Sequence, residues 1–460
     1  MGWIKNSAEV LRHGAVGLRR VALDALEAGL SAVDPYVLTK RLIRVEGEAL
    51  RVEDECIPLS ALGRVFVVGA GKGSFPICQA LEENLGDRIA KGMLSVKAGE
   101  TRRLQRITVV EAGHPVPDAR SLEAGKAILA ILQEAGQGDI VFAAITGGAS
   151  ALMEVPVQGL SLADMQETNV LLLNAGMTIA EMNAVRKHLS LLKGGRLAEH
   201  AQPARIVAIT LGTIPQGLPW PDPTKPDPST FGGAIAVLRR YDLWGKVPAA
   251  VHAYLTKGFA DPTLETPKSF REFTVPHLDV GNQAMACEGA AAAAARHGVR
   301  GVILATHIVG EARDVGTTLA GIAKEIQQYE RPFPPPCALI SGGEVTTTVR
   351  NPRGVGGPNQ EFVLAAARII DDLPNVVVAS IDTDGSDGPT DIAGAIADGE
   401  TAARAQTLGL DLAEVLARND TGTAFRKLGD AIYTGPTGTT VVNLRVIVVG
   451  GAPPMRTTIR

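Results

Sequence analysis

The residues best suited to chemistry are four aspartates that follow an apolar run. Residues 376–379 are apolar, and residues 380–391 then alternate aspartate with glycine, serine and threonine. Short apolar runs bounded by turn residues are typical of buried strands, and open α/β folds bind ligands beyond the carboxyl ends of their strands. Clustered carboxylates suit Mg²⁺ or another hard cation better than zinc. The segment indicates a cation site at a strand end, with a solvated acidic loop as the alternative.

Four other segments place glycines and small hydroxyl residues after apolar runs. They are residues 69–74, 146–151, 341–344 and 434–440. Such turns can present backbone N–H groups to an anion. One turn of this kind is only a tight turn, but four at strand ends predict a shared polyanion site. Its expected phosphate- or substrate-binding residues are Gly71, Gly73, Ser74, Gly147, Gly148, Ser150, Gly342, Gly343, Thr437 and Thr439.

Lys72 lies between two glycines of the first turn. A Walker A loop is excluded because Gly73 follows the lysine and the upstream glycine is missing. The turn is closer to a dinucleotide fingerprint with Ser74 in the last glycine position. However, residues 94–97 provide no acid for the ribose. We interpret Lys72 as functional, with a solvated turn lysine as the alternative.

Residues 183–196 form a basic, glycine-terminated segment. Arg186 and Lys193 are its candidates for neutralising a transferred phosphoryl group. The alternative is a solvated basic helix with a glycine C-cap. The segment has no Ser/His/Asp triad signature and no metal-binding histidine pair, so His188 is more simply structural.

Length and composition restrict the class of protein. A chain of 460 residues is too long for one core, which predicts two or three domains. The net charge of −4 argues against nucleic-acid binding. No apolar run reaches the roughly 18–20 residues of a membrane span, and the cysteines lack metal-site spacing. We expect a cytoplasmic protein with reduced thiols and a small-molecule substrate, without a nucleic-acid or membrane partner; a homodimer is compatible with this.

Strand-like and helical segments alternate along most of the chain. Expected strands are residues 65–68, 107–110, 140–145, 206–211, 302–305, 338–340, 345–349, 376–381 and 444–449, and expected helices are 121–134, 164–173, 287–297, 311–329 and 360–370. Such alternation predicts βαβ units, hence an α/β fold with largely parallel sheets. The prolines of residues 212–230 exclude a helix or central strand and indicate a linker near a domain boundary.

Together these motifs resemble the class II glycerate kinases, whose C-terminal part is called the MOFRL domain. The similarity covers nearly the whole chain and extends to residues 112–118, 183–196, 310–313, 359–361, 383–388 and 418–420. It implies two α/β domains with the active site in the interdomain cleft. These would be an N-terminal Rossmann-like domain at residues 1–235 and a C-terminal domain with the MOFRL region at residues 236–460.

The resemblance also implies a reaction. Members of this family transfer the γ-phosphoryl group of ATP to the 2-hydroxyl of D-glycerate and need a divalent cation, here Mg²⁺. By resemblance Lys72 is the active-site lysine, and Glu344, Asp384 and Asp387 lie near the metal and the phosphates. Lys72, Asp384 and Glu344 are the implied catalytic residues. Asn359 and Glu361, from another shared motif, are expected at the substrate or phosphates.

The chain departs from the family pattern at three positions. Thr213 and Gly217 replace two carboxylates that usually follow the strand at residues 206–211, and Pro358 replaces an arginine. The family pattern therefore does not identify the general base of this chain. Two rival hypotheses remain: an NAD(P)-dependent hydroxypyruvate reductase, and a degenerate member that binds nucleotide or a sugar acid without turnover.

Overall fold

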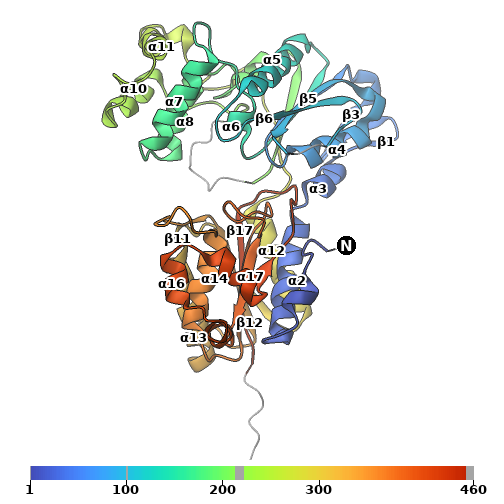
Figure 1. Cartoon of the computed structure of the whole chain (residues 1–460). Coiled ribbons are helices and arrows are strands. Elements are labelled where there is room, and N and C mark those ends of the chain that lie inside the picture. The colour runs from blue at the N-terminus through green and yellow to red at the C-terminus, as the bar shows by residue number, and fades with distance from the viewer. Residues whose placement is uncertain (1, 100–101, 213–221, 452–460) are drawn as a thin grey trace, which may run out of the picture. The chain divides into compact units, whose positions relative to one another are not determined.

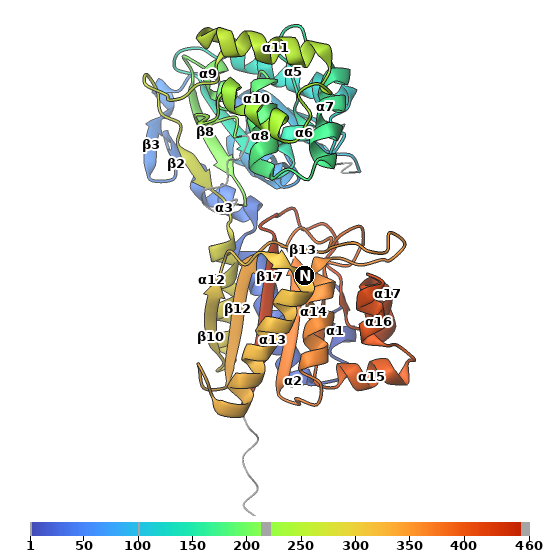
Figure 2. The ribbon, with the colours of Figure 1, turned by 90° about the vertical axis from the view of Figure 1, so that its left-hand side faces the viewer.

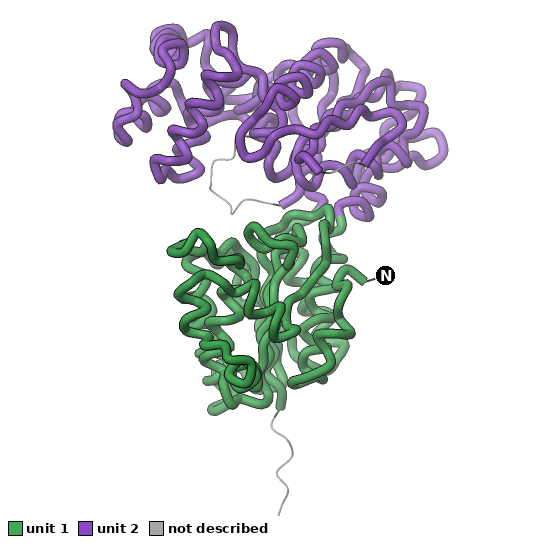
Figure 3. The backbone as a smooth tube through the Cα atoms, in the orientation of Figure 1, with its two compact units in different colours: residues 1–34, 281–460 green, residues 35–280 purple. Residues whose placement is uncertain are grey.

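The computed structural model describes residues 2–99, 102–212 and 222–451, which form two compact units (Figure 3). One unit is Pro35–Val280, and the other combines Met1–Asp34 with Gly281–Arg460. The expected division at residue 235 differs from these units. Helix α2 (Val16–Ala32) packs on helix α12 (Gln283–Arg296), so the N-terminus folds with the C-terminal half. Strand β9 (His277–Asp279) pairs with β8 (Arg205–Thr210) and extends the first unit to residue 280.

The first unit is built on a six-stranded sheet of order β6-β5-β4-β7-β8-β9, parallel throughout. Its remaining strands are β4 (Val65–Ala70), β5 (Ile89–Lys97), β6 (Ile107–Ala112) and β7 (Ile140–Ile145). This is the order of doubly wound dinucleotide-binding folds. The order in which the chain adds strands to this sheet reverses between β4 and β7, and every residue of these two strands is buried. Ligands of such folds bind at the carboxyl ends of the strands at this reversal.

Helices cover this sheet and carry the loops at its edge. They are α3 (Pro35–Leu42), α4 (Ser74–Leu85), α5 (Ala119–Glu134), α6 (Ala149–Leu152), α7 (Leu162–Asn174), α8 (Ile179–His188), α9 (Arg196–His200), α10 (Phe231–Arg240) and α11 (Ala249–Ala260). Helices α7, α8, α10 and α11 lie together in Figure 2. Their buried apolar residues form a hydrophobic core of their own. A small antiparallel sheet of β1 (Ile43–Glu46), β2 (Ala49–Val52) and β3 (Glu55–Pro58) completes the unit.

The second unit contains a six-stranded mixed sheet of order β10-β12-β17-β14-β15-β16. Its strands are β10 (Arg300–Ala305), β12 (Cys337–Gly343), β14 (Val376–Asp382), β15 (Gly394–Asp398), β16 (Ala431–Ile432) and β17 (Asn443–Val449). Within this sheet β10 and β12 pair in parallel, whereas β17 lies between β12 and β14 and pairs antiparallel with both. The pairs β14–β15 and β15–β16 are also antiparallel. The prediction of largely parallel sheets is correct for the first unit and wrong for this one.

Helices also cover both faces of the second sheet. Helices α2 and α12 pack on one face, and α13 (Ala312–Tyr329) and α14 (Pro358–Ile369) pack on the other (Figure 1). Shorter elements are α1 (Ser7–Val10), α15 (Thr401–Thr407), α16 (Leu412–Ala417), α17 (Thr421–Leu428), β11 (Gly310–Glu311) and β13 (Val345–Thr346). The strand expected at residues 345–349 is thus only β13.

Buried charges fasten the N-terminal segment to this unit. Arg19 is fully buried, and it donates from Nε to Asp398 Oδ2 at 2.5 Å and from Nη1 to Asp430 Oδ1 at 2.6 Å. Arg404 and His13 also contact Asp430, each at 2.8 Å. The two ion pairs of Arg19 link residues that are 379 and 411 positions apart in sequence.

None of the helices within the described ranges combines the length and apolar character needed to cross a bilayer. All four cysteines are thiols; Cys56 is exposed and the other three are buried. Thr213 and Gly217 lie outside the described residues.

Candidate functional site

Backbone hydrogen bonds join the turn after β4 to the turn after β7. The N–H of Lys72 donates to Gly147 O at 2.8 Å, and the N–H of Gly73 donates to Thr146 Oγ1 at 3.0 Å. Gly71 has φ of 131°, and a Cβ there would lie 2.1 Å from Thr146 Oγ1. The close approach of the two turns therefore requires glycine at position 71.

Ser74 is buried at the start of α4, and its hydroxyl lies 2.8 Å from Ala70 O and 2.9 Å from Ala144 O. The groups predicted to bind phosphate at Gly71, Gly73 and Ser74 thus have partners within the fold. In this structure these three residues hold the two strand ends together.

The turn after β7 has available N–H groups. Those of Gly147, Gly148 and Ser150 donate to no atom of the described residues. Gly148 has φ of 92° and precedes α6, so the amides follow one another around a left-handed corner. Successive N–H groups in such a turn can bind an anion. This is the arrangement that the sequence predicted for residues 146–151.

A cavity of about 270 Å³ opens beside this turn. Its wall comes from the loop between β6 and α5, the turn after β7, and helices α7 and α8; the polar lining residues include His114, Ser150, Glu154, Asn169 and Arg186. The cavity therefore lies at the carboxyl ends of the strands, next to the reversal in strand order.

Arg186 supplies positive charge to the cavity wall. Its Nε donates to Asn169 Oδ1 at 2.6 Å, whereas its two terminal amino groups donate to no described residue. Partial burial lowers the pKa of Arg186 from its usual value. A guanidinium with two available amino groups suits bidentate binding of a carboxylate or phosphate.

Lys193 and Glu154 form a buried ion pair behind this wall. Each side chain is 1 % exposed, and Lys193 Nζ contacts Glu154 Oε2. Burial lowers the pKa of Lys193, and the attraction of Glu154 opposes that shift. Lys193, predicted to bind phosphate, is thus engaged with a carboxylate of the fold.

His114 lies where Lys72 and the turn after β7 meet. A Cβ built on Gly148 would be 3.2 Å from His114 Nε2 and 3.6 Å from Lys72 Cγ. Burial, followed by the charges of Lys72 and Lys97, lowers the pKa of His114 to about 4. His114 belongs to the shared segment at residues 112–118, and the sequence alone predicted no role for it. Its neutral imidazole at neutral pH is a contribution of the tertiary structure.

The His114 titration tests this contact without reference to catalysis. We expect an NMR-detected pKa near 4 in the native chain and a higher value in Lys72→Met, because a nearby positive charge is removed. Since the folded pKa lies below the ordinary 6.5, His114 makes stability fall as pH drops from about 6.5 toward 4. Lys97→Met should raise the value less. An unchanged His114 pKa in Lys72→Met would show that the charge of Lys72 does not act on His114.

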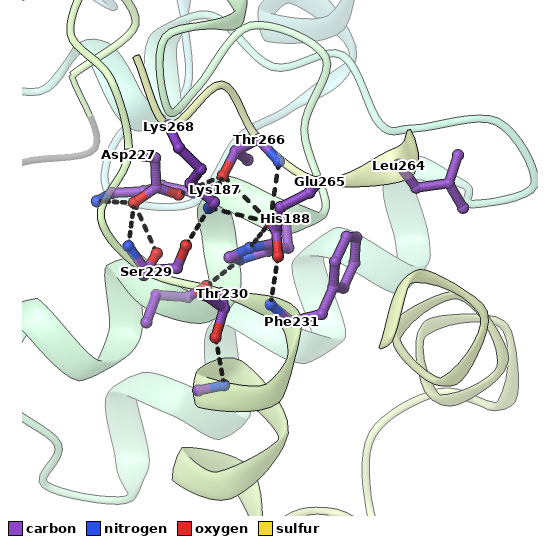
Figure 4. Close-up of polar contacts among 12 residues, drawn as sticks. Lys187, His188, Asp227, Ser229, Thr230, Phe231, Leu264, Glu265, Thr266 and Lys268 are labelled. Atoms are coloured by element: carbon purple, nitrogen blue, oxygen red, sulfur yellow. Dashed lines mark hydrogen bonds and ion pairs between the residues drawn. The ribbon is translucent and has the colours of Figure 1, made fainter. Parts of the chain in front are cut away.

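A buried ion pair and a histidine–carboxylate hydrogen bond anchor the end of α8, directly after Arg186 (Figure 4). Lys187 Nζ lies 2.9 Å from Asp227 Oδ1, and His188 Nε2 lies 2.7 Å from Glu265 Oε1. Lys187 is 2 % exposed and its partner is fully buried. The cluster orients the helix turn that carries Arg186 toward the cavity. The basic segment is therefore largely structural, apart from Arg186.

We expect Lys187→Met to destabilise this unit by about 3–5 kcal/mol, because Asp227 would remain buried without its cation. Chemical denaturation monitored by circular dichroism measures the loss. Lys268→Met is the matched control in the same cluster, since that side chain is 38 % exposed and should contribute less than about 1 kcal/mol. Equal losses in both variants would contradict the assignment.

In the second unit, Asp387 is fully buried and caps α14. Its oxygens accept the backbone N–H groups of Asn359 and Gln360, each at 2.9 Å. They also accept the side-chain amides of the same residues, at 2.9 and 3.0 Å. Burial raises the pKa of Asp387 to about 6, although these hydrogen bonds favour its ionised form. The carboxylate predicted as a metal ligand is thus engaged with a helix N-terminus, where negative charge is favourable.

Asp384 and Glu344 are more accessible. Asp384 is half-buried and accepts the N–H of Ser386 at 3.0 Å, while Glu344 is exposed. The described part of the chain contains no group of three or more His, Cys, Asp or Glu side chains placed to hold a metal. The predicted trio with Asp387 therefore does not form a ready-made cluster.

Gly342 and Gly343 allow neighbouring segments of the chain to approach closely. Gly343 has φ of 118°, and a Cβ there would lie 2.2 Å from Ile308 O. Buried Arg445 donates to Gly342 O at 3.3 Å and to Gly343 O at 3.2 Å. Burial lowers the pKa of Arg445 to about 10. Arg445 was not among the residues predicted from the sequence, where its signal is a charge inside the apolar run at residues 444–449.

The remaining predicted residues also have partners inside the second unit. The Thr437 hydroxyl donates to Thr383 O at 2.6 Å, and the Thr439 hydroxyl donates to Val33 O at 2.8 Å. Both side chains are buried. They hold the loop at residues 434–440 in place.

Asn359 and Glu361 extend the same interior network. Asn359 Oδ1 accepts the Ser380 hydroxyl at 2.5 Å. Glu361 accepts from Asn419 Nδ2 at 2.6 Å and from Arg313 at 2.8 Å. Burial raises the pKa of Glu361. Neither side chain faces solvent.

Known proteins resemble this chain over nearly its whole length. Residues 21–256 match the family described as "Domain of unknown function (DUF4147)", and residues 337–443 match the MOFRL family. A Pyrococcus horikoshii protein named glycerate 2-kinase is 38% identical over 95% of this chain and 98% of its own. A Thermotoga maritima protein named D-glycerate 2-kinase is 36% identical over 89% of this chain and 98% of its own.

A solved structure agrees with the sequence relatives. The crystal structure of a Thermotoga maritima glycerate kinase matches with a TM-score of 0.83 at 34% identity, covering 94% of this chain and 99% of that one. With its glycine turns, its cavity at the reversal of strand order and these relatives, this chain belongs to the glycerate 2-kinase family.

Proposed function

We propose that this chain is a glycerate 2-kinase, which transfers a phosphoryl group from ATP to the 2-hydroxyl of D-glycerate. The supporting observation is the cavity at the ends of β4 and β7, where Arg186 and the turn at Gly148 form the wall and Lys72 lies beside that turn. Its volume of about 270 Å³ suits a small acid, because pockets for drug-sized ligands begin near roughly 300 Å³. The cytoplasmic location and the homodimer stay predictions.

Each group has a role that its chemistry supports. The Arg186 guanidinium would bind the glycerate carboxylate, and the amides of Gly147, Gly148 and Ser150 would bind anionic oxygens. Lys72 would offset charge on the transferred phosphoryl group. Phosphoryl transfer depends mainly on positioning and electrostatic stabilisation. The replacement of the family carboxylate by Thr213 is therefore compatible with turnover.

We assign Mg²⁺ binding to Asp384 and Glu344. They follow β14 and β12, which flank β17 and run in the same direction, so both residues lie at one edge of the sheet. Two strand spacings of about 4.8 Å separate those strands. Mg²⁺ keeps several waters and uses one or two carboxylates together with phosphate oxygens, so this donor pair fits without a third side chain. The cation would supply charge neutralisation at the phosphates.

Two features weigh against a nicotinamide-dependent reductase. The N–H groups of residues 71–74 already donate within the fold, although a dinucleotide fingerprint would use this turn for pyrophosphate. The end of β5 carries Lys97 where the ribose-binding acid is expected. The kinase therefore accounts better for the first unit.

A coupled ADP-release screen over three- and four-carbon hydroxy acids tests the function. We expect Mg²⁺-dependent ADP formation to be greatest with D-glycerate, and ³¹P NMR to place the phosphate on its 2-hydroxyl. NADH oxidation by hydroxypyruvate without any ADP formation would instead favour the reductase. Calorimetric binding of ATP with Mg²⁺, without ADP release from any acid, would identify a degenerate binder.

A further inference from the structure

Glu154 is a residue of the cavity wall, and the proposed reaction leaves its buried carboxylate without a role. It lies in the wall with Arg186, and its side chain is 1 % exposed. Its Oε2 contacts Lys193, whereas Oε1 accepts no hydrogen bond from any residue in the described ranges. A buried carboxylate oxygen without a donor is costly. A ligand that brought a donor to Oε1 would remove this cost.

We propose that Glu154 Oε1 binds a substrate hydroxyl that is not phosphorylated, so that the cavity selects polyhydroxylated acids over simple 2-hydroxy acids. This inference rests on the proposed function of the same cavity. The occupant of Oε1 must be a donor, because a carboxylate there would meet like charge. The substrate carboxylate has a better partner in the available amino groups of Arg186.

The burial of Glu154 indicates which hydroxyl of the substrate it binds. A group bound to a side chain that is 1 % exposed lies deep in the cavity wall, whereas the reacting hydroxyl must reach the γ-phosphate of ATP. For D-glycerate this places the carboxylate at Arg186, the 3-hydroxyl at Glu154 and the 2-hydroxyl on the side of Lys72. Glu154 is then a specificity-determining residue that binds substrate without taking part in bond making.

The test compares D-glycerate with D-lactate, which lacks only the 3-hydroxyl. We expect the native chain to prefer D-glycerate by at least about a hundredfold in kcat/KM, since sites built to bond a hydroxyl strongly reject its deoxy analogue. Glu154→Gln should raise KM for D-glycerate by about tenfold or more, the usual effect of losing a hydrogen bond to a charged group. The constants for D-lactate should change less than about threefold. The preference for D-glycerate over D-lactate in kcat/KM is therefore expected to fall in Glu154→Gln.

A second variant and a binding measurement separate the loss of a substrate hydrogen bond from a structural effect of the substitution. Glu154→Met combined with Lys193→Met removes both charges, so it avoids a buried unpaired lysine and should also lose the preference. Equal losses with both acids would show a merely structural role and overturn the inference. Calorimetry with each acid in the absence of ATP separates this inference from the kinase proposal. Glu154-dependent binding of D-glycerate without ADP formation would refute the kinase alone.

Discussion

Replacing Lys72 by alanine is expected to lower kcat for D-glycerate phosphorylation by about a hundredfold or more. The lysine follows β4 at the reversal of strand order, and its backbone is held by the 2.8 Å hydrogen bond to Gly147. It also lies beside Gly148 and lowers the pKa of His114, so its charge reaches the turn with available amides. Charge that develops during transfer would lose this stabilisation. Steady-state kinetics at saturating ATP and Mg²⁺ measure the loss.

Lys97→Ala is the matched control for this experiment. Lys97 ends the neighbouring strand β5 and is exposed, and its charge contributes less than that of Lys72 to the lowered pKa of His114. We expect its kcat to stay within about threefold of the native value, as is usual for exposed charges. Near-native turnover in Lys72→Ala, with circular dichroism unchanged, would remove Lys72 from the mechanism.

Arg19→Met is expected to destabilise the second unit by about 3–5 kcal/mol, because two buried carboxylates lose their shared cation. Asp398 and Asp430 are both 1 % exposed or less, and Arg404 compensates only in part, with Nη2 2.8 Å from Asp430 and 3.7 Å from Asp398. The loss should free α2 from the sheet. Denaturant unfolding monitored by circular dichroism measures the loss in free energy of unfolding, and calorimetry provides a second measurement.

Arg20→Met provides the control on the same helix. Arg20 is exposed, so its replacement should change stability by less than about 0.5 kcal/mol. If Arg19→Met cost under about 1 kcal/mol, the buried network would not be what fastens residues 1–34 to the C-terminal half. Such a result would also weaken the physical account of the domain division.

Sequence patterns predicted the elements whose signals are local. The apolar runs at β4 and β7 and their glycine turns were located correctly, because a fully buried strand needs an uninterrupted apolar run. Strand β5 was missed because Lys91 and Gly92 interrupt its apolar residues. The antiparallel insertion of β17 was missed because periodicity identifies a strand but not its neighbour or direction.

The candidate residues divide in the same way. The sequence predicted an anion-binding turn at Gly148 and singled out the cation of Arg186, since residue type and turn chemistry are local properties. It did not distinguish Arg186 from Lys193, which the structure pairs with Glu154. Nor did it distinguish Asp384 from Asp387, which the structure uses to cap α14.

The sequence by itself determined the family, the glycine-rich strand ends and the set of charged groups available for phosphoryl transfer. Only the tertiary structure decided which of those groups face a cavity and which are consumed by partners within the fold. The reason is that a buried charge or hydroxyl must find a partner, and that partner is often far away in sequence. The pairs Glu154 with Lys193 and Arg19 with Asp398 are 39 and 379 positions apart.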